Sequence, residues 1–189
     1  MLVNLRHFNA NIIEDIKVPK SVELVWVKVI PKFNCPVNVF VVCGLYSKPN
    51  SKTKTVTNDH IAENFHYLKS KYTSIKFFII GDFNDLRPDI ILQQSPQLRQ
   101  LVHHKTCGES IIDLIISDCH NLYHPPFSTQ PLQPDDPEKA KESDHLVNLF
   151  LPRTDSSISS RRTFNLIKIR PITASQINAI GNLLIKQDR

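Results

Sequence analysis

The chain has 189 residues, 41% of them hydrophobic and 22% charged, so it is large and apolar enough to bury the core of one domain. No apolar run approaches the roughly 18 residues of a membrane helix, and the first 20 residues lack the pattern of a secretion signal, which excludes these two classes. The formal net charge is +5, with a pI near 9.0, which makes a polyanion the natural partner to consider.

Two strands and a helix are predicted in the first half of the chain. Residues 22–30 alternate apolar and polar side chains, and residues 37–46 are richer in valine, which predicts a more deeply buried strand. A polar loop follows over 47–59, and it ends at Thr57 or Asn58, either of which can cap a helix. Helical spacing then marks one apolar face of about four turns, formed by Ile61, Phe65, Leu68 and Tyr72.

The second half continues the alternation of strands and helices, and together they indicate an α/β class. The predicted elements are a strand over 75–80 bounded by Gly81, a short helix from Ser95-Pro96 to Val102, an apolar run over 110–118, a proline-rich loop over 124–142, and a strand over 144–152. The domain is therefore expected to cover 1–152. Residues 153–189 differ from the domain, and a basic, serine-rich linker followed by a helix is expected there.

Charge is distributed unevenly along the chain, and the cysteines show no metal-binding pattern. Residues 1–80 carry a net charge of +6, residues 81–150 carry −6, and residues 151–189 carry +5. An acidic centre in a basic frame fits a cation site that serves a polyanion, although ordinary solvated surface gives the same pattern more often. The four cysteines have no Cys-x-x-Cys spacing, which favours reduced intracellular thiols over a disulfide framework or a zinc site.

The stretch Gly81-Asp82-Phe83-Asn84 is the first candidate site. If the strand continues through it, Asp82 and Asn84 face one side while Phe83 turns into the core. A carboxylate beside a carboxamide suits a phosphodiester site, because the acid can hold a cation or orient water and the amide can contact a phosphoryl oxygen. Gly81 permits a close approach of a ligand or of neighbouring backbone. An Asx-type turn at a strand end explains the same residues equally well.

Three further positions carry chemistry. Asp144-His145 precedes the last strand, where a histidine can bind phosphate or transfer a proton, although a lone Asp-His pair is usually surface. Asp113 lies inside an apolar run, so it needs a partner unless it lies at a strand edge, and His145 is the natural candidate. Tyr46 ends a strand and can donate to a phosphate, but alone it more often belongs to the core or rim.

Taken in order, these motifs resemble the endonuclease/exonuclease/phosphatase superfamily, and within it the endonuclease domain of non-LTR (LINE-type) retrotransposons. The resemblance covers about residues 20–152 and is carried by "FHYLKSKYTSIKFFIIGDFNDLRPD", "ESIIDLIISD" and "SDHLVNLF". It implies a DNase I-like four-layer α/β/β/α sandwich that acts as a DNA endonuclease. The tail is similar to the segment that joins such a domain to a reverse transcriptase.

The resemblance also implies roles for individual residues. Asp82 and Asn84 would orient the attacking water and contact the scissile phosphate, and His145, supported by Asp113, would bind or protonate it. Tyr46 would hydrogen-bond the phosphate. The expected metal ligands are Asp144 and Asp82, and the expected cation is Mg²⁺ or Mn²⁺.

One departure from the family pattern bears on activity. The family has an early asparagine and a metal-binding glutamate, and the 45 residues before Tyr46 contain only Glu14 and Glu23, neither in the family's motif. The expectation is therefore a domain without its opening strands and with impaired endonuclease activity. Two alternatives stay open: a non-catalytic retroelement remnant that binds nucleic acid, and a same-fold phosphatase that acts on a small phosphorylated substrate.

Overall fold

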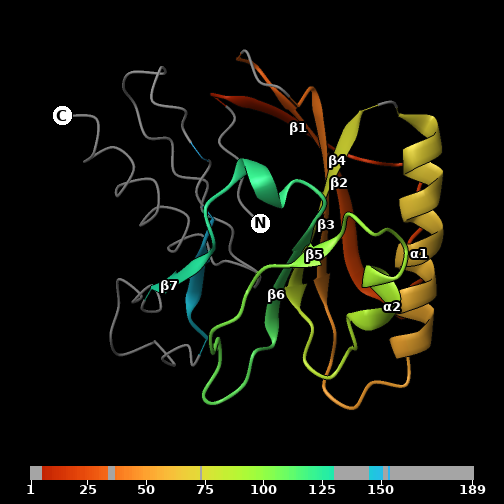
Figure 1. Cartoon of the computed structure of the whole chain (residues 1–189). Helices are drawn as coiled ribbons and strands as arrows, with labels where there is room; N and C mark the ends of the chain where they lie inside the picture. Colours follow the sequence, from red (N-terminus) through yellow and green to blue (C-terminus); the bar gives the residue numbers. More distant parts are fainter. Residues whose placement is uncertain (1–5, 34–36, 73, 130–144, 151–152, 154–189) are drawn as a thin grey trace, which may run out of the picture.

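A six-stranded sheet forms the centre of the protein in the computed structural model, which describes residues 6–33, 37–72, 74–129, 145–150 and 153 (Figure 1). The strand order is β1-β2-β3-β4-β6-β5. Strands β3 and β4 are parallel, and all other neighbours in this sheet are antiparallel. The strands are β1 (Phe8–Ile12), β2 (Glu23–Pro31), β3 (Val39–Tyr46), β4 (Ile75–Asp82), β5 (Arg99–Gln100) and β6 (Asp113–Ser117).

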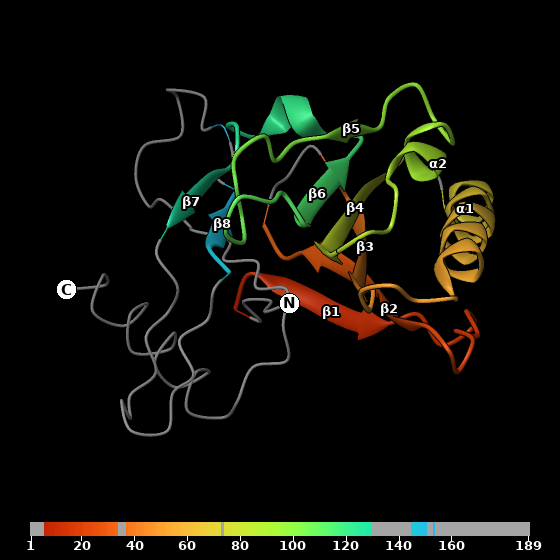
Figure 2. The same ribbon diagram turned by 90° about the horizontal axis from the view of Figure 1, so that it is seen from below.

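The two faces of this sheet carry different layers. Helices α1 (Lys54–Lys71) and α2 (Asp89–Leu92) cover one face, and a second sheet of β7 (Phe127–Thr129) and β8 (Val147–Leu149) lies on the other (Figures 1 and 2). A 3₁₀ turn, η1 (His120–Leu122), lies between β6 and β7 in sequence. The predicted α/β class is confirmed. The described residues show helix, sheet and sheet in the order of the predicted sandwich.

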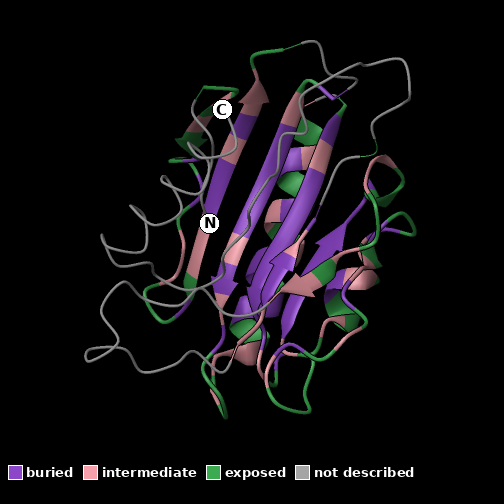
Figure 3. Cartoon of the chain, turned by 90° about the vertical axis from the view of Figure 1, so that its left-hand side faces the viewer, coloured by how far each residue is buried: buried purple, intermediate pink, exposed green. Residues whose placement is uncertain are grey.

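Alternating side chains along β4 build two cores. Phe77 and Ile79 pack with the apolar face of α1, and the rings of Phe65 and Phe77 lie 4.5 Å apart. Phe78 and Ile80 belong to the other core, which contains Phe150 at the end of β8. The central strands are buried along almost their whole length (Figure 3), which explains why residues 75–80 are apolar at nearly every position.

The boundaries of α1 differ from the prediction. The helix begins at Lys54, and Thr57 and Asn58 are buried inside it instead of capping it. The Ser51 hydroxyl accepts a hydrogen bond from Thr53 N, and Thr57 N donates to Thr53 O, so the first turn starts three or four residues earlier. The predicted apolar face is confirmed, since Ile61, Phe65 and Leu68 are all in the core.

Two other expectations about local structure fail. The helix predicted from Ser95 to Val102 is wrong: the short helix is α2, and Arg99–Gln100 pairs with β6 as a strand. Ser95 closes only a turn, with Leu98 N donating to Ser95 O, and pairing with a buried strand then decides the conformation. The first strand, β1, was not predicted. It forms by antiparallel pairing with β2, and its side chains are all half-buried or exposed.

Some predictions concern segments outside the described residues. Residues 130–144, which include Asp144 and most of the predicted loop over 124–142, and residues 154–189 are among them, so the domain boundary and the linker stay predictions. Arg153 is described, and its backbone N donates to Leu122 O at 2.8 Å. Among the described helices, none combines the length and apolarity needed to cross a membrane.

Candidate active site between the two sheets

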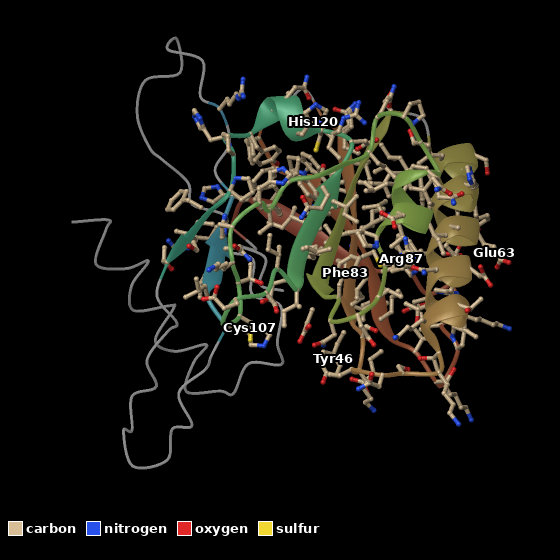
Figure 4. The ribbon with its side chains drawn as sticks, turned by 60° about the horizontal axis from the view of Figure 1, so that its bottom comes forward. Tyr46, Glu63, Phe83, Arg87, Cys107 and His120 are labelled. Atoms are coloured by element: carbon tan, nitrogen blue, oxygen red, sulfur yellow. The ribbon has the colours of Figure 1, made fainter. Side chains whose placement is uncertain are left out.

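Three predicted site residues form a row across neighbouring strands. Tyr46 at the end of β3 is in register with Asp82 at the end of β4, and Asp82 is in register with Asp113 at the start of β6. Ile80 and Ile115 pack on the side of the second sheet, so Asp82 and Asp113, two residues away along their strands, face that side as well. Tyr46 lies at this end of the sheet (Figure 4). The row therefore lies at one end of the space between the two sheets.

His145, two residues before β8, joins this row. Its Nδ1 lies 2.7 Å from Asp113 Oδ2, so the predicted contact between the two residues is confirmed. Both side chains are largely buried, at 10% and 4% exposed. One potential ligand atom from each of Asp82, Asp113 and His145 lies within 4.8 Å of the others. Residues that are far apart in sequence thus meet in one cluster.

The electrostatics of the cluster favour a bound cation or proton. Burial raises the pKa of the Asp113 carboxyl, and neighbouring Asp82 adds to the rise, whereas His145 opposes it. Asp82 is itself 1% exposed. Two adjacent buried carboxylates are costly to keep ionised, and a divalent cation removes that cost. Their oxygens and one imidazole are a donor set that fits a divalent metal ion.

Asn84 lies beside the cluster but not on the strand. Strand β4 ends at Asp82, and Asn84 has a φ of 46°, the left-handed conformation that asparagine tolerates. Its backbone N donates to Asp82 Oδ1 at 3.2 Å, and its Nδ2 donates to Ser47 O at 2.7 Å. The Asx-type turn is therefore real, and the expectation that strand alternation sets Asn84 beside Asp82 is wrong. Phe83 does turn into the core as predicted, at 1% exposed.

Gly81 is needed by the neighbouring backbone. A Cβ atom at this position would lie 2.0 Å from Leu45 O of β3, far inside any real contact distance. Of the two readings that the sequence left open, close approach of backbone is the one observed. The absence of a side chain lets β3 and β4 pair closely, which keeps Tyr46 and Asp82 side by side.

Thr106 is a site residue that the sequence reading missed. It is fully buried, and its Oγ1 accepts hydrogen bonds from the backbone N of Ile112 and of Asp113, both at 3.0 Å. Its carbonyl accepts from Leu146 N at 2.8 Å. Thr106 therefore holds the chain at Asp113 and at the residue after His145. A threonine in "HHKTCGE" carries no periodic or spacing signal, so only the fold reveals it.

Comparisons with known proteins give fold likenesses alone. No protein-family model matches the chain, and no curated protein matches it. Among solved structures, the catalytic domain of human Nocturnin with a bound sulfate anion is similar, with 15% identity over 77% of this chain and a TM-score of 0.45. A beta toxin from Staphylococcus aureus is also similar, with 15% identity over 66% of this chain and a TM-score of 0.44. This chain covers 59% and 55% of those two chains.

Proposed function

We propose that the protein is a metal-dependent phosphodiester hydrolase, and that its substrate is DNA. The observation that carries the proposal is the buried cluster of Asp82, Asp113 and His145, with the 2.7 Å contact between Asp113 and His145. The order of motifs along the chain, which resembles the endonuclease domain of LINE-type retrotransposons, supports DNA as the substrate. The basic charge of residues 1–80 supports a polyanion.

The Asp113–His145 pair defines the first chemical role. When His145 Nδ1–H donates to Asp113 Oδ2, the tautomer and the orientation of the ring are fixed, and Nε2 becomes the nitrogen that exchanges a proton with substrate. A histidine held in this way can bind a phosphoryl oxygen and transfer a proton near neutral pH. Asp113 acts through the imidazole and stabilises its charged form.

Asp82 and Asn84 supply the second role. The Asp82 carboxylate faces the same side of the sheet as Asp113 and can orient an attacking water. Asn84 is held by Ser47 O and by the Asp82 side chain, so its carboxamide stays next to the carboxylate. Tyr46, on the adjacent strand, adds a hydroxyl that can donate to the phosphate. Each of these residues thus orients water or substrate.

A divalent cation, Mg²⁺ or Mn²⁺, would be held by Asp82 with Asp113, and when bound it would supply charge neutralisation at the phosphate. Asp144 stays a proposed ligand on the strength of the resemblance alone. The glutamate motif that the resemblance implies is not found before Tyr46. We therefore propose that DNA cleavage by this chain is slow.

Nicking of supercoiled plasmid by the purified chain tests the proposal. We expect slow nicking that requires Mg²⁺ or Mn²⁺, stops with EDTA, and falls roughly 100-fold or more in Asp82→Asn and in His145→Gln. His120→Gln, which changes a histidine of the 3₁₀ turn, is the matched control and should leave the rate unchanged. Binding of DNA without metal-dependent nicking would favour the non-catalytic alternative. Cleavage that the variants leave intact would indicate a contaminating nuclease.

A further inference from the structure

The loop that follows Tyr46 is fastened directly to the site. Ser47 is buried, its backbone N donates to Asp82 O at 2.8 Å, and its carbonyl accepts from Asn84 Nδ2 at 2.7 Å. Farther along the loop, Asp85 Oδ2 accepts from Asn50 N at 3.0 Å and from Lys54 Nζ. Residues 47–54 are therefore held against the Asp82–Asp85 turn at both ends. The backbone of Lys48, next to Ser47, is thereby held near the cluster of Asp82, Asp113 and His145.

Lys48 is held on the site side of the sheet by an ion pair. Its Nζ lies 2.7 Å from Glu23 Oε1 at the start of β2. Glu23 is in register with Tyr46, which is in register with Asp82, so the row across the sheet continues to Glu23. On β2, Val27 and Val29 pack in the core between the sheets, and by strand alternation Glu23 faces the same side. Two strand spacings, about 10 Å, separate Glu23 from Asp82.

We propose that Lys48 is a substrate-positioning residue that binds a second phosphate of the same DNA strand, within a few nucleotides of the one that is cleaved. The inference rests on the proposed function. It implies that the preferred substrate has several linked phosphodiesters and is not a small molecule with a single one. Along one nucleic-acid strand a charge recurs about every 3.4 Å of helix axis, so a separation of about 10 Å falls within a few nucleotides. The pair with Glu23 raises the pKa of Lys48, so the ammonium stays charged.

The pair with Glu23 does not prevent this binding. Both side chains are mostly exposed, at 65% and 54%, and an exposed ion pair contributes little free energy because water screens its charges. A phosphate can therefore displace the carboxylate at little cost. In the absence of substrate, Glu23 keeps the Lys48 side chain near it. Lys48 therefore loses less conformational entropy when it binds a phosphate.

The test compares two substrates and three variants of the full chain. Affinity for a fluorescein-labelled 20-base-pair DNA is measured by anisotropy at several salt concentrations, and hydrolysis of bis(p-nitrophenyl) phosphate, a single phosphodiester, is measured alongside. For Lys48→Gln we expect affinity for DNA to fall roughly threefold to tenfold and the slope of log K against log salt to shrink by about 0.9, the value of one phosphate contact. Hydrolysis of the small diester should be unchanged.

Two control variants make the result specific. Lys71→Gln removes another exposed lysine of an ion pair, near the end of α1, and should leave the salt slope unchanged. Lys48→Arg should restore the slope, because it restores the charge. An unchanged slope in Lys48→Gln, or an equal loss in Lys71→Gln, would overturn the inference. Loss of small-diester hydrolysis in Lys48→Gln would also overturn it. Failure of the wild-type chain both to hydrolyse the small diester and to nick plasmid DNA would instead overturn the proposed function, since the salt slope is measured without turnover.

Discussion

The Asp113 carboxyl has a raised pKa and lies in contact with His145. A substitution at Asp113 should therefore change the stability of the fold and the proposed activity in different directions. Burial and Asp82 raise the pKa of its carboxyl, so the folded protein pays to keep it ionised at neutral pH. A carboxyl whose pKa is raised on folding contributes most to the stability of the folded state at low pH. That contribution to stability is lost as the pH rises from the unfolded pKa of 3.8 through the folded pKa. The ionised form of Asp113 is therefore less favourable to folding than the protonated form.

We expect Asp113→Asn to lower hydrolysis roughly 10²- to 10⁴-fold while leaving the folded state as stable as the wild type, or more stable, at pH 7. Asparagine fills the same volume and can still accept from His145 Nδ1, but it cannot stabilise the imidazolium. Plasmid nicking and urea unfolding followed by tryptophan fluorescence would measure the two effects. A large loss of stability in this variant would show that the charge is needed for the fold.

Thr106 gives a prediction of the opposite kind. Thr106→Val keeps the shape and removes the hydroxyl, which leaves the backbone N–H groups of Ile112 and Asp113 without their acceptor. We expect a loss of about 1–3 kcal/mol in unfolding free energy together with a large fall in activity. Thr106→Ser keeps the oxygen and should retain most of both. Equal behaviour of the two variants, in urea unfolding and in nicking, would contradict the positioning role.

At the scale of elements, helix α1 holds a histidine in its neutral form. His60 is 7% exposed, with Trp26 Nε1 of β2 at 3.4 Å from its Nε2 and Asn64 Nδ2 at 3.3 Å from its Nδ1. The indole N–H can only donate, so it requires an unprotonated ring nitrogen. Burial lowers the pKa of His60, and Glu63 on the same helix opposes this only in part.

The direction of this shift predicts a pH dependence of stability. Because the folded pKa lies below the unfolded value of 6.5, the unfolded chain takes up the proton first, and stability falls as the pH drops from 6.5 to the folded pKa. We expect the urea midpoint of the wild type to fall between pH 7.5 and 5.5 by more than that of His60→Gln. His66→Gln, on the same helix with its ring bound to Gln94, is the matched control and should follow the wild type.

The elements also show what the sequence can and cannot reveal. Strands β2, β3, β4 and β6 were predicted because burial on one or both faces leaves a local pattern, and Asp82, Asp113 and His145 stood out as polar groups at the ends of these patterns. The turn at Ser95 and strand β1 were missed because distant strand pairing decides them. The start of α1 was missed because hydrogen bonds of Ser51 and Thr53 begin the helix before its apolar face begins. Thr106 and the need for Gly81 depend on contacts with residues far along the chain, which no local pattern records.

At the scale of the molecule, the acidic cluster should couple metal binding to folding. A cation that binds only the folded protein stabilises it by about 2.7 kcal/mol at 100 times its dissociation constant, which corresponds to a rise in Tm of roughly 5–10 °C for a chain of this size. We expect Mn²⁺ or Mg²⁺ to produce such a rise in differential scanning fluorimetry, and Asp82→Asn to abolish most of it. Asp89→Asn, an exposed acid of α2, is the control. An equal response of all three proteins would indicate nonspecific ion effects.

The row of Tyr46, Asp82 and Asp113 is completed by His145, which lies 32 residues after its partner Asp113 and two residues before β8 of the second sheet. During synthesis, the first sheet can therefore pair its strands while the histidine has yet to leave the ribosome. The contact between Asp113 and His145 can form only after residue 145 has emerged, and the entropy of closing the intervening chain is lost before the contact can stabilise the fold. Under the proposed function, the site is therefore complete only when His145 has reached Asp113, and a nascent chain that ends before residue 145 has no complete site.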